Sequence, residues 1–269
     1  MKKLIILFIS LFVFASIGFT QNPWVNKKGS LYAQVSTSFI PEYTTGFQDD
    51  GGVEEITFAT NDRTFSFYGS YSLTNRLELT LNIFQKSVSA DGNNLNNLGD
   101  PELQLKYQFP VNIPLAVYGS YTAPLSEREG ILRTGYNQHA VEAGLSVGVS
   151  KNMVFAYASS GFRYRENIPN QISIDAEVGT VQDFGNTALL LAFHVDGVIN
   201  TSEAIDPLGD QTLLYHNNGS FISPGIKASL NFYKNWWINV SGFGAIRATN
   251  QAASPGLSIG IAYKTSAGE

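Results

Sequence analysis

The sequence predicts an all-β fold, a transmembrane up-and-down antiparallel β-barrel of about 12 strands. Three observations predict it. Apolar and polar residues alternate with a period of two along repeated stretches of the chain. The connections between these stretches are alternately short and long. Charged residues make up only 14% of the chain, against about 25% in average soluble proteins. An exterior with so few charges suits lipid better than water.

The chain begins with the layout of a secretory signal peptide. Two lysines precede an apolar run from Leu4 to Phe19, which ends in small, weakly polar residues near Thr20 and Gln21. The run is shorter than the roughly 20 residues that a spanning helix needs, so we expect export and cleavage rather than a membrane anchor. The predicted division is a signal peptide at 1–20, a periplasmic lead-in at 21–30, an outer-membrane β-barrel at 31–264 and a periplasmic tail at 265–269.

The stretch from Thr64 to Phe84 sets the pattern for the strands. Two alternating runs, separated by the turn at residues 74–76, predict a β-hairpin with one apolar face and one polar face. Including this hairpin, the same unit occurs five times along the chain. The expected strands are 31–40, 64–73, 77–84, 102–109, 113–123, 138–149, 153–165, 171–182, 187–200, 220–232, 236–248 and 256–264.

The connections support a barrel with two unlike ends. Tight turns of three or four residues join the strands of each hairpin, and longer polar segments join one hairpin to the next. Short periplasmic turns opposite longer external loops are typical of outer-membrane barrels, whereas a Greek-key sandwich gives no reason for such alternation. A soluble β-barrel is the alternative architecture. The six longer segments are 41–62, where the strands could instead extend beyond the main body, 88–99, 124–135, the shorter loop 166–170, 201–218 and the polar connection that leads into the last strand.

The register of each hairpin follows from keeping apolar residues on one face. A slip of one residue would move every side chain to the opposite face, so the pattern restricts the pairing strongly. The expected pairs are Phe67 with Ile83, Leu230 with Ile238, Val178 with Leu191, and Asp175 with His194.

The apolar face is expected to contact lipid and the polar face to line the lumen. The polar positions hold mostly Ser, Gly, Thr, Asn, Gln and Ala with scattered charges, whereas a soluble exterior would be rich in Lys and Glu. Arg163 falls at the lipid-facing positions, where its charge could reach the headgroups. A wall of small residues predicts a narrow conduit or cavity beside Gly144, Ser146, Gly148, Val154, Ala156 and Ala158.

Charged residues at lumen positions are the candidate binding residues. Three carboxylates and an imidazole near the turn at residues 183–186 could bind a cation. The favoured alternative is that they pair with lysines across the lumen, and neither a metal nor a cofactor is expected. The candidate lumen residues are Asp175, Glu177, His194, Asp196, Glu78, Glu102, Lys106, Glu142 and Lys227.

Composition narrows the functional classes. The chain has no cysteine, three histidines and no G-x-S-x-G motif, so no catalytic constellation stands out and no enzyme is expected. A net charge of −5 argues against nucleic acid as a partner. The expected partners are outer-membrane lipid and lipopolysaccharide, the barrel-assembly machinery and a small-molecule solute.

The segment LGDPELQLKYQF, from Leu98 to Phe109, resembles a known family. It is similar to outer-membrane transporters of the MetA-pathway of phenol degradation family, relatives of the FadL-like transporters, and the Tyr71–Leu79 hairpin fits the same pattern. The resemblance covers most of the mature chain, although the usual aromatic residue at the extreme C-terminus is absent here. It implies a passive channel or transporter for small solutes, hydrophobic or aromatic ones among them. A structural or adhesive barrel with functional surface loops, or an outer-membrane hydrolase, is the alternative.

Overall fold

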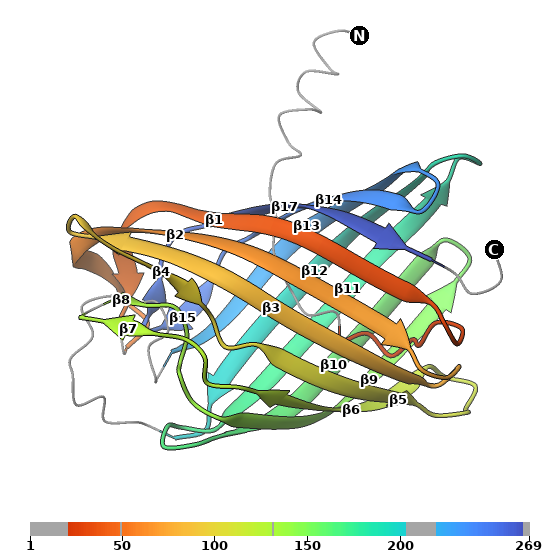
Figure 1. Ribbon diagram of the computed structural model, residues 1–269, viewed down its shortest axis with the longest axis horizontal. Coiled ribbons are helices and arrows are strands. Elements are labelled where there is room, and N and C mark those ends of the chain that lie inside the picture. Colours follow the sequence, from red (N-terminus) through yellow and green to blue (C-terminus); the bar gives the residue numbers. More distant parts are fainter. Residues whose placement is uncertain (1–20, 49, 131, 203–218, 266–269) are drawn as a thin grey trace, which may run out of the picture.

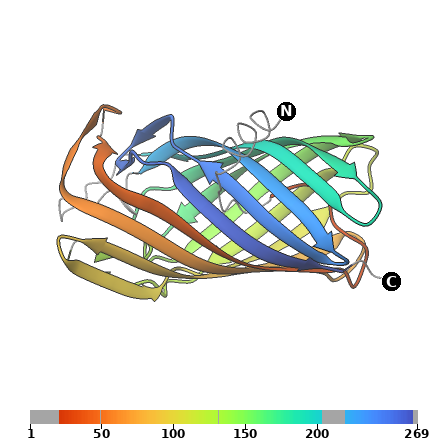
Figure 2. The ribbon, with the colours of Figure 1, turned by 90° about the horizontal axis from the view of Figure 1, so that it is seen from above.

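The computed structural model is a closed antiparallel barrel of 12 strands (Figures 1 and 2), as predicted. It describes residues 21–48, 50–130, 132–202 and 219–265, so the predicted signal peptide lies outside the described residues. Each wall strand pairs with its neighbours along the chain, and the first strand closes the barrel by pairing with the last. The wall strands are β1 (Leu31–Phe47), β2 (Val53–Ser72), β3 (Leu77–Ala90), β5 (Glu102–Gln108), β6 (Leu115–Thr122), β9 (Ala140–Lys151), β10 (Val154–Arg165), β11 (Gln171–Asp183), β12 (Ala188–Asn200), β13 (Ser220–Tyr233), β14 (Trp236–Phe243) and β17 (Gly256–Lys264).

The two ends of the barrel differ as the connections predict. All five tight turns lie at one end, which we call the turn end, on the right of Figure 1. The longer connections lie at the opposite loop end and carry short strands of their own. These are β4 (Asn93–Leu98), β7 (Arg128–Glu129), β8 (Leu132–Arg133), β15 (Arg247–Thr249) and β16 (Gln251–Ala252). Among the described residues no helix is long and apolar enough to cross a membrane.

Two segments predicted as loops are largely strands. In 41–62 the strands extend beyond the main body, which was the alternative to a loop, because β1 continues to Phe47 and β2 begins at Val53. In 88–99 the prediction of a loop is wrong, because β3 and β4 form a hairpin around Asp91 and Gly92, which have φ values of 51° and 75°. Asp-Gly is a strong signal for such a turn. The polar composition concealed these strands, because only a few of their side chains, Val88, Ala90 and Leu95 among them, reach an apolar core.

Two of the three predicted registers are confirmed. Phe67 pairs with Ile83, and Leu230 pairs with Ile238. The register between β11 and β12 is shifted by two residues, so that Val178 pairs with Phe193. A shift of two leaves every side chain on its own face, and the apolar pattern therefore could not detect it.

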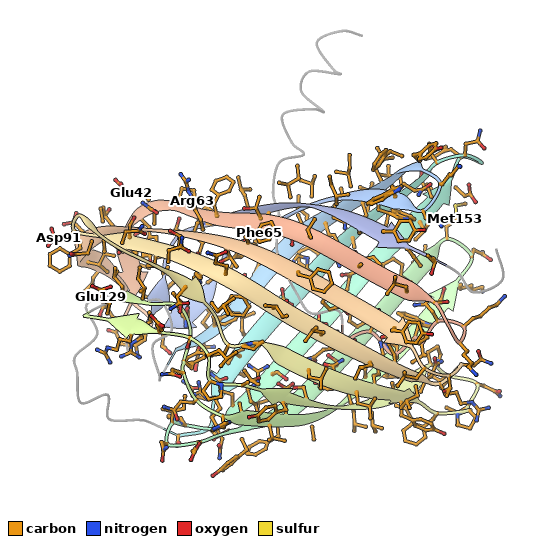
Figure 3. All side chains as sticks on the ribbon, in the orientation of Figure 1. Glu42, Arg63, Phe65, Asp91, Glu129 and Met153 are labelled. Carbon is orange, nitrogen blue, oxygen red and sulfur yellow. The ribbon has the colours of Figure 1, made fainter. Side chains whose placement is uncertain are left out.

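Apolar side chains of the wall face outward and polar side chains face the lumen, which is the reverse of the distribution in a soluble protein. Large apolar side chains on the wall are exposed, among them Phe65 at 56% (Figure 3), whereas serines, amides and charged groups on the opposite face are buried. In β10 the predicted faces are wrong. Tyr157 and Arg163 point inward, and Val154, Ala156 and Ala158 do not. The aromatic residues of β10 suggested lipid, but Tyr157 lies against another aromatic ring inside the barrel.

A small apolar core stabilises the loop end. It contains side chains from the loop-end parts of the wall strands β1 and β3 and from the short strands β4 and β8 (Figure 1). Its buried members are Tyr43, Val88, Ala90, Leu95 and Leu132. Burial of these side chains gives the loop-end strands a fixed shape of their own.

Asp100, in the motif that carries the family resemblance, organises the connection between β6 and β9. Its Oδ1 accepts hydrogen bonds from the backbone N–H groups of Leu125 (3.2 Å) and Ser126 (2.9 Å). Its Oδ2 accepts from those of Tyr136 (2.7 Å) and Asn137 (3.0 Å). The side chain is buried, so the motif contributes a structural clamp for this loop.

Candidate functional site

Two lysines in the lumen pair with carboxylates, and one of these carboxylates, Glu177, belongs to the group near the turn at residues 183–186. Lys106 Nζ on β5 lies 2.8 Å from Glu78 Oε1 on β3, and both side chains are buried. Lys227 Nζ on β13 lies 2.6 Å from Glu177 Oε2 on β11. Each pair cancels the charge of both partners, which reduces the cost of burying them.

A third ionic cluster joins β5, β9 and β10. The guanidinium of Arg163 contacts Glu142 Oε2 through both Nε and Nη2 at 2.7 Å, and Nη2 lies 3.7 Å from Glu102. Glu142 Oε1 also accepts hydrogen bonds from the hydroxyls of Ser173 (2.6 Å) and Tyr118 (3.1 Å). Glu142 is therefore held by donors from three strands, β6, β10 and β11, and its carboxylate is fixed in the wall.

The carboxylates near β11 and β12 lie together, but not in the predicted pairs. Asp175 is paired with Asp196, and Glu177 with His194, whereas the sequence analysis placed Asp175 opposite His194. His194 Nε2 lies 3.3 Å from Asp196 Oδ2, and the hydroxyl of Tyr157 donates to Asp175 at 3.4 Å. In the part of the chain that the structure describes, no group of three or more such side chains could hold a metal ion.

Residues 21–26, which we call the N-terminal segment, lie inside the barrel. The segment enters from the turn end, where the N–H of Lys28 donates to Asn75 Oδ1 at 2.8 Å. Further along, the N–H of Val25 donates to Gln108 at 2.8 Å, and Lys106 Nζ donates to the carbonyl of Asn22 at 3.1 Å. The sequence predicts a periplasmic lead-in at residues 21–30, and this prediction gives its first part no place in the lumen.

Gln21 is the innermost described residue of the N-terminal segment, and it is only 7% exposed. Its side-chain Oε1 accepts hydrogen bonds from the hydroxyls of Tyr118 (2.7 Å) and Ser159 (2.9 Å). Its Nε2 donates to Glu142 at 3.4 Å, and its backbone N–H donates to Asp175 Oδ2 at 3.3 Å. The segment therefore bridges the two acidic clusters of the lumen.

Trp24 anchors the N-terminal segment against β9 and β10. Its ring meets those of Phe155 and Tyr157 edge to face, at centroid distances of 6.3 and 6.1 Å. Gly148 on β9 provides the space, because a Cβ atom there would lie 2.7 Å from Pro23 and 2.9 Å from Trp24. A tryptophan in an otherwise polar lead-in was the sequence signal for this burial, since such a ring is rarely left in water.

A cavity of about 500 Å³ lies beside the N-terminal segment. Uncharged polar groups line part of it, and Asn239 Nδ2 donates to Gln34 Oε1 at 2.8 Å and to the hydroxyl of Tyr32 at 3.2 Å. Among the described residues, the buried Oδ1 of Asn82 has no hydrogen-bond partner, and Asn82 is one of the residues that line the cavity. Six aromatic residues also line the cavity: Trp24, Tyr32, Tyr68, Phe155, Tyr157 and Trp237.

The comparisons with known proteins identify the fold. The COG4313 outer membrane channel from Pseudomonas putida F1 superposes with a TM-score of 0.69 at 14% identity, over 93% of this chain and all of that chain. The KdgM porin gives 0.48 at 10% identity over 87% and 98%, and LpxR from Salmonella typhimurium gives 0.49 at 9% over 87% and 99%. No protein-family model and no curated protein matches the chain, so the resemblance to the MetA-pathway family stays a prediction.

Proposed function

We propose that the protein is an outer-membrane channel or transporter for small, uncharged solutes that combine an apolar ring with hydroxyl groups. The observation that carries the proposal is the cavity in the lumen of a barrel whose exterior is apolar. A cavity of this size is within the range that small-molecule sites occupy. The fold shared with an outer-membrane channel and the family resemblance support the same class. We also propose that a signal peptide directs export of the protein. The barrel-assembly machinery then inserts the barrel into an outer membrane of lipid and lipopolysaccharide.

The charges around the cavity favour an uncharged solute. Glu177 and Glu78 are each paired with a lysine, so neither side chain is free to neutralise a charged guest. Most of the remaining polar groups are hydroxyls and amides, which exchange hydrogen bonds with hydroxyl groups of a solute, and Lys264 adds one ammonium group to the lining. Aromatic rings on several sides supply apolar contact for a ring. The nine candidate lumen residues thus hold the wall in shape, and their part in binding is proposed here.

Liposome swelling with three related solutes tests this function. Phenyl glucoside is uncharged and aromatic, phenyl glucuronide adds a carboxylate, and glucose lacks the ring. We expect phenyl glucoside to enter fastest through the reconstituted protein. Absence of swelling with all three solutes would refute the proposed channel function. Faster entry of the glucuronide would refute the preference for uncharged solutes.

Two adjacent tryptophans provide a matched pair of variants. Trp237 lines the cavity, and Trp236 is exposed on the outer face. Trp237→Ala should reduce the preference for phenyl glucoside over glucose by about two- to tenfold, as expected for loss of about 0.5–1.5 kcal/mol of ring contact. Trp236→Ala should leave the preference unchanged. Equal effects of the two variants would show that the cavity does not select the solute.

A further inference from the structure

We propose that Gln34 and Asn239 form a subsite of the lumen cavity that recognises a hydroxyl group of the solute as donor and acceptor at once. The inference rests on the proposed channel function, and it names the residues that select the solute and the kind of group that they select. Both side chains line the cavity. They come from β1 and β14, which lie on either side of β17 where the barrel closes.

Hydrogen bonds among three side chains fix the orientation of both amides. Gln34 Oε1 accepts from the hydroxyl of Tyr32 at 2.5 Å and from Asn239 Nδ2 at 2.8 Å. Asn239 Nδ2 also donates to the Tyr32 hydroxyl at 3.2 Å. These bonds use both hydrogens of the Asn239 amide and both lone pairs of the Gln34 carbonyl. The atoms that face one another therefore have no capacity left for a solute.

The other atom of each amide remains available. Among the described residues, neither Gln34 Nε2 nor Asn239 Oδ1 has a hydrogen-bond partner. The cavity wall therefore offers one donor and one acceptor from two amides that are themselves joined at 2.8 Å. Turning both amides over together would exchange the two roles and would leave the same pair of one donor and one acceptor.

Gly260 on β17 leaves this pair of amides uncovered. It lies between Asn239 on β14 and Ser36 on β1 in the register of the wall. A Cβ atom at Gly260 would lie 3.2 Å from Gln34 Nε2 and 2.8 Å from the Cβ atom of Ser36. Trp237 also lines the cavity, and it shares a face of β14 with Asn239, about 7 Å away along the strand. A solute whose ring lies on Trp237 therefore presents its hydroxyl groups to the two amides.

A hydroxyl group suits this subsite because it both accepts and donates hydrogen bonds. It accepts from Gln34 Nε2 and donates to Asn239 Oδ1, and two hydroxyls on neighbouring carbon atoms can divide these roles. An ether or a ketone only accepts, and an ammonium group only donates, so each leaves one amide atom without a partner. The subsite therefore selects alcohols, such as the free hydroxyls of a glycoside, over the corresponding ethers.

Isothermal titration calorimetry of the protein in lipid nanodiscs tests the subsite with two ligands. Phenyl glucoside has free hydroxyls, whereas its tetra-O-methyl ether keeps the acceptors and has no donor. The unaltered protein should bind the glucoside more tightly. Asn239→Leu removes the acceptor, which only the glucoside uses, and should weaken binding of the glucoside about two- to tenfold with little change for the ether. Gln34→Met removes the donor, which both ligands use, and should weaken binding of both.

Asn112→Leu, in the exposed turn between β5 and β6, is the matched control, and the migration of unheated protein in SDS gels reports the folding of each variant. Equal affinity of Asn239→Leu and the control for phenyl glucoside would overturn the subsite, as would equal affinity of the unaltered protein for the two ligands. If Asn239→Leu does not fold, the same comparison is made with Gln34→Met. Entry of phenyl glucoside into liposomes would then leave the channel function intact, whereas absence of both binding and entry in the unaltered protein would refute both.

Discussion

Replacement of Asp100 by asparagine changes a single atom of the clamp that holds the connection between β6 and β9. Each carboxylate oxygen of Asp100 accepts two backbone N–H groups. Whichever oxygen becomes the amide nitrogen, two of the four N–H groups then face a donor and lose their acceptor. We therefore expect the connection to open locally while the barrel wall stays folded.

The size of the effect follows from these contacts. A hydrogen bond to a charged group contributes about 1.5–3 kcal/mol, and two lost bonds partly overlap because they share one oxygen. A loss of about 3 kcal/mol in the free energy of local opening corresponds to roughly a 100-fold increase in the open population. The rate of proteolysis follows this population when closing is faster than cleavage.

Limited trypsin digestion of the protein in liposomes measures this opening. The connection contains Arg128, which is exposed, and Arg133, which is buried. Cleavage after Arg133 should be about 100-fold faster in Asp100→Asn, with little change after Arg128. Asp91→Asn, at the exposed tip of the β3–β4 hairpin, is the control. An equal rate after Arg133 in the two variants would refute the assignment of Asp100 as a clamp.

Two further predictions concern the wall. Lys106→Met should destabilise the barrel by about 3–5 kcal/mol in urea unfolding, because Glu78 is then buried without its cation. Addition of Glu78→Gln to this variant should restore most of the lost stability. An unchanged unfolding midpoint in the single variant would contradict the pairing of Lys106 with Glu78. The register of β11 and β12 can be tested in this cysteine-free chain. Val178→Cys with Phe193→Cys should form a disulfide, whereas Val178→Cys with Leu191→Cys should not, and the reverse result would restore the register expected from the sequence.

The pattern of apolar residues was sufficient to predict the barrel, because each wall strand must present one face to lipid and the other to the lumen. The predictions from this pattern fail where the pattern does not restrict the structure. A shift of two residues, as at Val178, leaves the pattern unchanged, and the sequence offers no other restraint on that hairpin. The loop-end parts of β1 and β2 contribute only a few apolar side chains to a small core, and their polar, acidic composition favoured a loop.

The candidate site was only partly predictable for a related reason. The luminal positions of Lys106 and Lys227 follow from strand parity, and both pair with carboxylates. The position of Gln21 does not, since it depends on a segment without secondary structure that folds back into a lumen formed by residues far along the chain. Arg163 was misplaced because the aromatic residues of β10 suit either lipid or the ring of Trp24.

The apolar core at the loop end has a practical consequence. The β3–β4 hairpin is held by Val88, Ala90 and Leu95 in this core, so support reaches the residue directly before its two-residue tip at Asp91 and Gly92. The tip is exposed, and both of its residues have positive φ. A foreign peptide inserted there would be carried on a rigid stalk, and the barrel would serve as a scaffold for surface display of epitopes.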